Sequence, residues 1–214
     1  MSDDRSGGPA EQQHPPSSPP QGVVLVEGDS DRRALEALAT RRGRDLTGEG
    51  VAIVAIGGAT NIRRFLERFG PYGLDVALAG LCDEAEGPFF RRALVAAGLL
   101  SDMDGGRAAL EGAGFFVCEP DLEGELIRAL GVEAVERVIE AEGELASLRL
   151  LQRQPAHQGQ PVEGQLHRFM GTRAGRKAAY ARRLVEVLDA QQVPHPLDGV
   201  LGRVGSPSGR SATG

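Results

Sequence analysis

Residues 23–39 read Val-Val-Leu-Val-Glu-Gly-Asp-Ser-Asp-Arg-Arg-Ala-Leu-Glu-Ala-Leu-Ala, and the fold predicted for the rest of the chain follows from this stretch. The run Val23–Val26 is short, apolar and rich in β-branched residues, which is typical of a strand buried on both faces of a parallel sheet. Alanine and leucine then recur at helical spacing, and Asp29 or Ser30 is the expected N-cap. The stretch therefore predicts a strand, a tight turn and a helix.

Acidic side chains lie on both sides of this turn. Glu27 follows the strand, Gly28 permits a sharp reversal, and Asp31 lies in the first helical turn. Asp29 and Asp31 have a simpler interpretation, because both charges complement the helix dipole. Glu27 lacks that explanation, since a glutamate at a strand end neither caps the helix nor has an evident partner. We therefore expect Glu27 and Asp31 to converge at the carboxyl edge of the sheet, where open α/β sheets bind ligands.

Length and composition limit the classes of protein to consider. The chain has 214 residues, which is enough for one sizeable core and an appendage. It has no tryptophan and only 4% aromatic residues, so the core is expected to consist mainly of Ala, Val and Leu. The net charge of -6 excludes a strongly basic nucleic-acid coat. Binding of a polyanion would instead need a local basic patch or bound metal ions.

Cysteine use and the termini indicate a reducing compartment. Cys82 and Cys118 lie in apolar stretches, where a free thiol behaves as a small hydrophobe, and two cysteines make no disulfide framework. The N-terminus is rich in Pro, Ser and Gln and lacks an apolar signal core, and no stretch is apolar for long enough to cross a bilayer. We expect a cytoplasmic protein with no membrane partner and with disordered tails at 1–22 and 205–214.

Apolar periodicity predicts an α/β fold, with a parallel sheet of about four strands flanked by helices and a C-terminal helical extension. After the first strand and helix, the further strands are expected at 51–56, 74–81 and 115–118. The principal later helices are expected at 62–69, 132–151 and 193–204, with one or two helices at 166–188. This pattern indicates an α/β domain at 23–131 and a helical extension at 132–204.

A glycine pair follows the second predicted strand and opens the next helix. The backbone amides of Gly57 and Gly58 are candidate phosphate donors, because free amides at a helix start attract anions. The alternative interpretation is a tight strand-to-helix turn without a ligand.

Acidic residues also follow two other predicted strands. Asp83 follows the third strand, and Asp121 and Glu123 follow the fourth. Taken alone, each residue is explained as well by capping the following helix or complementing its dipole as by binding a ligand. Parallel strands joined by right-handed crossovers, however, bring their carboxyl ends to one edge. We therefore predict that Glu27, Asp83 and Glu123 lie together at one edge of a single sheet.

These motifs carry a resemblance to a known family. Glu-Gly-x-x-Asp at 27–31 resembles the first motif of Toprim domains, the catalytic module of topoisomerases, primases and OLD-family (overcoming lysogenization defect) nucleases. Leu-Glu-x-x-Leu at 122–126 resembles the segment that supplies metal ligands in OLD-family domains. The family expects Asp-x-Asp at the third strand end, but here Asp83 is followed by Ala85 in the second position, with Glu86 as the substitute. The order of motifs extends the resemblance over 23–204 and predicts a Toprim-like Rossmannoid sheet.

The resemblance implies a site for two hard cations. Clustered carboxylates repel a polyanion unless Mg²⁺ or Mn²⁺ bridges them to phosphate oxygens. In an in-line displacement, one cation activates the attacking water and the other stabilises the leaving oxygen. The expected ligands are Glu27, Asp31 and Asp83 for the first metal, and Glu123 with Asp121 or Glu86 for the second.

Lys177 is the one lysine among 24 basic residues. It lies in a predicted helical stretch with a basic patch made of Arg168, Arg173, Arg176, Arg182 and Arg183. A compact ammonium suits phosphate as a point charge, so Lys177 and Glu27 are the predicted catalytic residues. Arg173 and Arg176 are predicted to bind phosphate. The alternative for the whole patch is a solvated helix face.

The predicted function is metal-dependent cleavage or nicking of DNA. OLD nucleases carry an ABC-type ATPase domain ahead of the Toprim domain, and this sequence has no Gly-x-x-x-x-Gly-Lys-Ser/Thr motif. We therefore expect a free-standing Toprim protein that acts with a separate ATPase or defence-system partner, and a homodimer is compatible with the sequence. The choice between DNA and RNA, and between a nick and a double-strand cut, is left open.

Two other functions compete with cleavage. The first is a catalytically degenerate Toprim module that binds nucleic acid or recruits a partner, and Ala85 favours it. The second is a phosphoacceptor receiver domain, which also combines strand-end acids with one lysine. That lysine should end a strand, whereas Lys177 is predicted to lie in a helix.

Overall fold

The computed structural model describes residues 19–101, 105–173 and 175–204. The predicted tail 205–214 and nearly all of the tail 1–22 lie outside these residues, and Gly22 already belongs to the first strand. The strands are β1 (Gly22–Val26), β2 (Val51–Ala55), β3 (Ala77–Asp83) and β4 (Phe115–Cys118). The helices are α1 (Asp29–Arg41), α2 (Ile62–Phe69), α3 (Gly87–Ala96), α4 (Gly106–Gly112), α5 (Leu122–Leu130), α6 (Val132–Ala141), α7 (Leu145–Gln152), α8 (Val162–Met170), α9 (Arg176–Val187) and α10 (His195–Val204).

The four strands form one parallel sheet in the order β2-β1-β3-β4. In the register, Val26 pairs with Ala55 on one side and with Leu81 on the other. All four carboxyl ends therefore lie at the same edge of the sheet. The predicted four-stranded parallel α/β fold is confirmed.

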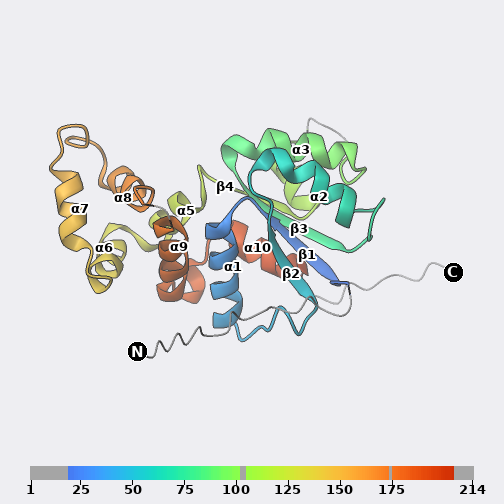
Figure 1. The fold of residues 1–214 in the computed structure, drawn as a ribbon, viewed down its shortest axis with the longest axis horizontal. Helices are drawn as coiled ribbons and strands as arrows, with labels where there is room; N and C mark the ends of the chain where they lie inside the picture. The colour runs from blue at the N-terminus through green and yellow to red at the C-terminus, as the bar shows by residue number, and fades with distance from the viewer. Residues whose placement is uncertain (1–18, 102–104, 174, 205–214) are drawn as a thin grey trace, which may run out of the picture.

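Helices cover both faces of the sheet (Figure 1). Val24 and Val26 point into a core shared with α1 and α10, whereas Val23 and Leu25 point into a second core shared with α2 and α3. All four side chains are fully buried. Burial on both faces explains why β1 is a continuous apolar run rather than an alternating one.

The helical part lies to one side of the sheet, with α6, α7 and α8 farthest from it in Figure 1. Two of the later helices return to the α/β part, because α9 packs along α1 and α10 packs on β3, β4 and β1. One continuous apolar core joins the sheet to these helices. The range 132–204 is therefore not a separate structural unit, since its last helix forms part of the layer that covers the sheet.

Three predicted elements differ from the structure. The helix expected at 132–151 is two helices, because Gly143 adopts a left-handed backbone with φ of 72° between α6 and α7. The third strand begins at Ala77 rather than Leu74. The N-cap of α1 is Gly28 rather than Asp29 or Ser30, and the Asp31 carboxylate accepts a hydrogen bond of 2.9 Å from the Gly28 amide. In the ranges described, no helix is long and apolar enough to cross a membrane.

The contact between α10 and β4 predicts a destabilising substitution. A Cβ at Gly199 would overlap the ring of Phe116, whereas one at Gly202 on the same helix would meet nothing within 4 Å. We expect Gly199→Ala to lower the free energy of unfolding by about 1–3 kcal/mol through overpacking, and Gly202→Ala to raise it by up to about 1 kcal/mol through helix propensity. Urea unfolding followed by circular dichroism measures both. Equal effects of the two substitutions would contradict this packing.

Candidate metal centre

Three carboxylates meet at the carboxyl edge of the sheet. Glu27 directly follows β1, Asp83 is the last residue of the neighbouring β3, and Glu123 lies in the first turn of α5 after β4. Because β1, β3 and β4 are parallel neighbours, the three residues share one edge. This part of the sequence prediction is confirmed.

Burial and mutual repulsion both disfavour ionisation of these carboxylates. Burial raises the pKa of Asp83 to about 7, and the charges of Asp31 and Glu27 contribute to that rise. Burial likewise raises the pKa of Asp31 to about 6, with repulsion from Glu123 and Glu27 opposed by the Gly28 amide and Lys177. These like charges cannot all ionise without cost, which is the electrostatic condition of a site built for a cation.

Glu86 belongs to the same cluster. It ends the short 3₁₀ helix Glu84–Glu86 that follows β3. Burial raises the pKa of Glu27, and the charge of Glu86 is the next largest contribution to that shift. Ala85, in the position where the family carries a second aspartate, is exposed. Glu86 is therefore near enough to Glu27 to serve as the substitute.

A second group of ligand atoms lies at the start of α5. The Asp121 carboxylate caps α5 by accepting a hydrogen bond of 2.9 Å from the Gly124 amide, and its Oδ2 lies 2.6 Å from Nε2 of His167 on α8. Asp121, Glu123 and His167 each offer a ligand atom, and these atoms lie within 4.8 Å of one another. Burial favours a higher pKa for Asp121, but the contacts with His167 and Gly124 outweigh it and lower the pKa.

Lys177 projects from α9 onto this group. Its Nζ lies 2.9 Å from Oε2 of Glu123, whose side chain is only 1% exposed. Burial opposes the ammonium form of Lys177, yet the carboxylates of Glu123, Asp83 and Asp121 raise its pKa. Burial also raises the pKa of Glu123, against the effect of Lys177. The only lysine therefore lies at the acidic edge, where the surrounding carboxylates favour its ammonium form.

Two buried carboxylate oxygens at this edge lack partners. Neither Oε2 of Glu27 nor Oε1 of Glu123 has a hydrogen bond within the described part of the chain. Burying an oxygen without a hydrogen-bond donor costs about 1–3 kcal/mol, and the cost is larger when the group is charged. The clustered carboxylates match the oxygen ligands that Mg²⁺ and Mn²⁺ prefer, whereas the imidazole of His167 is a ligand better suited to transition metals. The residues present thus fit divalent cations.

The glycine pair does not provide the predicted phosphate site. The amides of Gly57 and Gly58 both donate to the carbonyl oxygen of Glu27, at 3.1 and 3.2 Å. Both amides already donate hydrogen bonds and are not free to bind an anion, so the prediction that they bind phosphate is wrong. Their contribution is to hold the backbone of Glu27 at the sheet edge.

Arg176 also departs from its predicted role. It is buried, donates to Oε1 of Glu144 at 2.7 Å and to Oγ1 of Thr172 at 2.6 Å, and stacks on the ring of Phe169. Such a guanidinium holds helices together and cannot reach phosphate. Arg173 is exposed and lies 3.6 Å from the same Glu144 carboxylate, so its charge is only partly compensated.

Two further arginines of the predicted basic patch are neutralised, whereas Arg168 on α8 is exposed. Arg182 pairs with Glu186 at 2.7 Å, and Arg183 pairs with Glu142 at 2.9 Å. The sequence has few acids between 166 and 188, but acids from elsewhere on the chain or on the same helix face lie against these arginines. The patch is therefore less basic than its sequence indicates.

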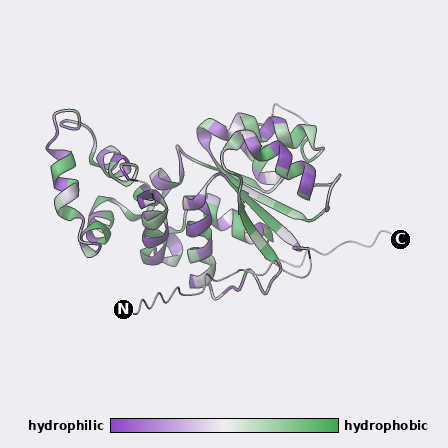
Figure 2. Ribbon diagram, in the orientation of Figure 1, coloured by the Kyte–Doolittle hydropathy of each residue, from purple (hydrophilic) through white to green (hydrophobic). Residues whose placement is uncertain are grey.

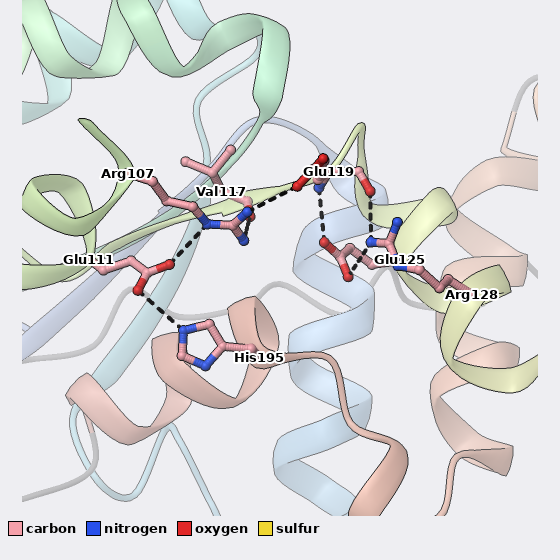
Figure 3. Close-up of polar contacts among 7 residues, drawn as sticks. All are labelled: Arg107, Glu111, Val117, Glu119, Glu125, Arg128 and His195. Atoms are coloured by element: carbon pink, nitrogen blue, oxygen red, sulfur yellow. Dashed lines mark hydrogen bonds and ion pairs between the residues drawn. The ribbon is translucent and has the colours of Figure 1, made fainter.

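A polar network holds the segment that carries Asp121 (Figure 3). Arg107 donates to the carbonyl of Val117 at 2.7 Å and pairs with Glu111 and Glu119. Figure 3 also shows Glu125, whose Oε1 accepts a hydrogen bond of 2.9 Å from the Glu119 amide. The network is completed by the pairs Glu125–Arg128 and Glu111–His195. It anchors the end of β4 and thus the start of α5.

His167 is the site residue that sequence reasoning missed. It lies 46 positions from Asp121, inside a helix whose apolar residues dominate the pattern. No local spacing links a single histidine to a distant aspartate, so only the packing of α8 against α5 reveals the pair.

The parallel sheet and its acidic carboxyl edge define an α/β domain of the Toprim type. Residues 21–83 match the family described as "Overcoming lysogenization defect protein-like, TOPRIM domain". The chain therefore carries an OLD-like Toprim domain.

Solved structures show the same fold over a longer part of the chain. The C-terminal region of the Burkholderia pseudomallei OLD protein is 23% identical, with 86% of this chain and 97% of that chain covered and a TM-score of 0.62. The C-terminal region of the Xanthomonas campestris pv. campestris OLD protein is 26% identical, with 86% and 94% covered and a TM-score of 0.63. No curated protein matches the chain in sequence. The structural likeness thus includes the helices after β4.

Proposed function

We propose that this chain hydrolyses phosphodiester bonds in DNA with the help of divalent cations at the acidic edge. The observation that carries the proposal is the buried, unpartnered carboxylate oxygens of Glu27 and Glu123 beside the only lysine. Such an arrangement is costly for a protein that binds nothing there. It becomes favourable when cations and a phosphate complete it.

The residues divide into two ligand groups. Glu27, Asp31 and Asp83 would hold one Mg²⁺ or Mn²⁺, and Glu123 with Asp121 or Glu86 would hold the other. His167 adds a nitrogen ligand atom to the second group. Bound there, the cations would activate water and offset negative charge on the phosphate.

Lys177 would act on the phosphate itself. Its ammonium is placed at the edge by α9 and is kept charged by the surrounding carboxylates. A cation held by Glu123 would leave the ammonium of Lys177 free to stabilise the charge that develops on the scissile phosphate. Glu27 is held for its role by the two amides of the glycine turn.

A binding module without cleavage is the second candidate. Ala85 in place of an aspartate and the existing Lys177–Glu123 ion pair favour it. The receiver-domain alternative receives no such support, because Lys177 lies on α9 rather than at the end of a strand. A separate ATPase or defence-system partner, a cytoplasmic location and a homodimer remain part of the proposal.

A plasmid-nicking assay tests the proposed function. Purified protein should convert supercoiled plasmid to nicked or linear forms in Mg²⁺ or Mn²⁺, and should leave it intact in EDTA. Glu27→Gln keeps the side-chain size but removes the charge, and should lower the rate by about 10²-fold, the scale of losing one preorganised electrostatic contact. Retained DNA binding without cleavage in any metal would favour the binding module.

A further inference from the structure

The outer surface of α2 and α3 differs in charge from the protein as a whole. The α2 sequence has three arginines and one glutamate, and the α3 sequence has two arginines and no acid. The whole chain carries a net charge of -6. The two helices lie side by side over one face of the sheet (Figure 1), and hydrophilic positions alternate with hydrophobic ones along them (Figure 2). A basic surface therefore stands out on an acidic protein.

Three of these arginines are exposed and stack on aromatic rings. The guanidinium of Arg64 lies 6.0 Å from the ring centre of Phe65, that of Arg68 lies 5.0 Å from Phe69, and that of Arg92 lies 4.8 Å from Phe89. Within the described residues, none of the three arginines forms an ion pair. On α9, by contrast, Arg182 and Arg183 pair with glutamates.

Stacking prepares these guanidinium groups for an anion. A ring beneath the guanidinium limits its motion, while the N–H groups at its edge stay available. Arginine presents these donors in a fork that matches phosphate oxygens. Three such groups without acidic partners favour a ligand with several phosphates over a single small anion.

The position of the helices connects this surface with the acidic edge. Both α2 and α3 follow strands of the parallel sheet, so their N-terminal ends lie at the carboxyl edge. Asp83 and Glu86 directly precede α3. The exposed apolar side chains Tyr72 and Leu74 lie beyond the opposite end of α2. A polyanion on the arginine surface would thus extend toward the candidate metal centre.

We propose that the outer surface of α2 and α3, with Arg64, Arg68 and Arg92, binds the phosphate backbone of DNA. The choice of DNA as the polyanion rests on the proposed function. Charge and geometry alone support the surface itself. It takes the place of the predicted basic patch, in which Arg176 is buried and Arg182 and Arg183 are paired with glutamates.

The test measures DNA binding without cleavage. The full chain is titrated against a fluorescein-labelled duplex of about 25 base pairs in EDTA, by anisotropy, at several NaCl concentrations. The triple variant R64Q/R68Q/R92Q should bind about tenfold or more weakly, and the slope of log affinity against log salt should fall by about 2–3, since each phosphate contact contributes about 0.9. Circular dichroism verifies folding, and the single variant R92Q should show a smaller loss of the same kind.

A matched variant controls for net charge. R137Q/R182Q/R183Q removes the same number of charges from exposed positions on α6 and α9, and should keep the affinity within about twofold. Equal weakening by the two triple variants, or no weakening by the first, would overturn the proposal. Binding of an RNA duplex with no affinity for DNA would also overturn it. Loss of plasmid cleavage with this binding pattern intact would instead refute the proposed function alone.

Discussion

Asp83→Asn is expected to raise the melting temperature of the metal-free protein at pH 8 and to abolish stabilisation by Mg²⁺ or Mn²⁺. Burial and the charges of Asp31 and Glu27 disfavour an ionised Asp83, so removing that charge relieves repulsion. Differential scanning fluorimetry in EDTA should show the melting temperature rising by about 2–4 °C for each kcal/mol of repulsion that the substitution removes. For the wild type, metal at 100 times its dissociation constant should contribute about 2.7 kcal/mol.

The same substitution should change the pH dependence of stability. The pKa of Asp83 is about 7 in the folded protein, against 3.8 for an unperturbed aspartate, so the folded state binds more protons between these values. The free energy of unfolding of the wild type therefore falls as pH rises from about 4 to about 7. The amide side chain of Asp83→Asn does not titrate, so the variant should lose this part of the decline. Urea unfolding in EDTA at pH 5 and pH 8 measures the difference.

Glu84→Gln serves as the matched control for Asp83→Asn. Glu84 is the next residue along the chain, is exposed, and is not among the predicted ligands. Its substitution should leave both the metal-free melting temperature and the metal response near those of the wild type. A metal-induced gain that is equal in the wild type and in Asp83→Asn would place the cation away from the sheet edge.

The sheet could be predicted because its signals are local. Each strand is a short apolar run, and a parallel arrangement joins their carboxyl ends without further information. The shared edge of Glu27, Asp83 and Glu123 follows from that topology alone. The break at Gly143 was missed because the apolar positions of α6 and α7 continue the same spacing across it.

The roles of polar groups were harder to predict because they depend on contacts across long sequence separations. From the sequence Arg176 was expected to be free, but its guanidinium pairs with Glu144, which lies 32 positions away along the chain. The amides of Gly57 and Gly58 were also expected to be free, but the carbonyl of Glu27 after the adjacent strand accepts both hydrogen bonds. The pattern of charges along a chain shows which groups are present, and packing decides which of them are already satisfied.

Lys177→Arg is expected to lower the rate of DNA cleavage by about 10²-fold, and Lys177→Ala by at least as much, with little change in DNA affinity. The ammonium lies 2.9 Å from Oε2 of Glu123, a spacing that suits a compact point charge. A planar guanidinium on a longer side chain would collide with this site or turn away from it. Single-turnover cleavage at saturating DNA measures the rate separately from binding.

The stability of the metal-free protein tests the role of Lys177 independently of cleavage. Lys177→Ala leaves the Glu123 carboxylate buried without its cation, so the melting temperature in EDTA should fall, and saturating Mn²⁺ should restore most of the loss by neutralising Glu123. Arg183→Lys, on the same helix but paired with Glu142, should leave both cleavage and stability near wild type. Full cleavage by Lys177→Arg would show that only a positive charge is needed at this position, and Lys177 would then be a structural partner of Glu123 rather than a catalytic residue.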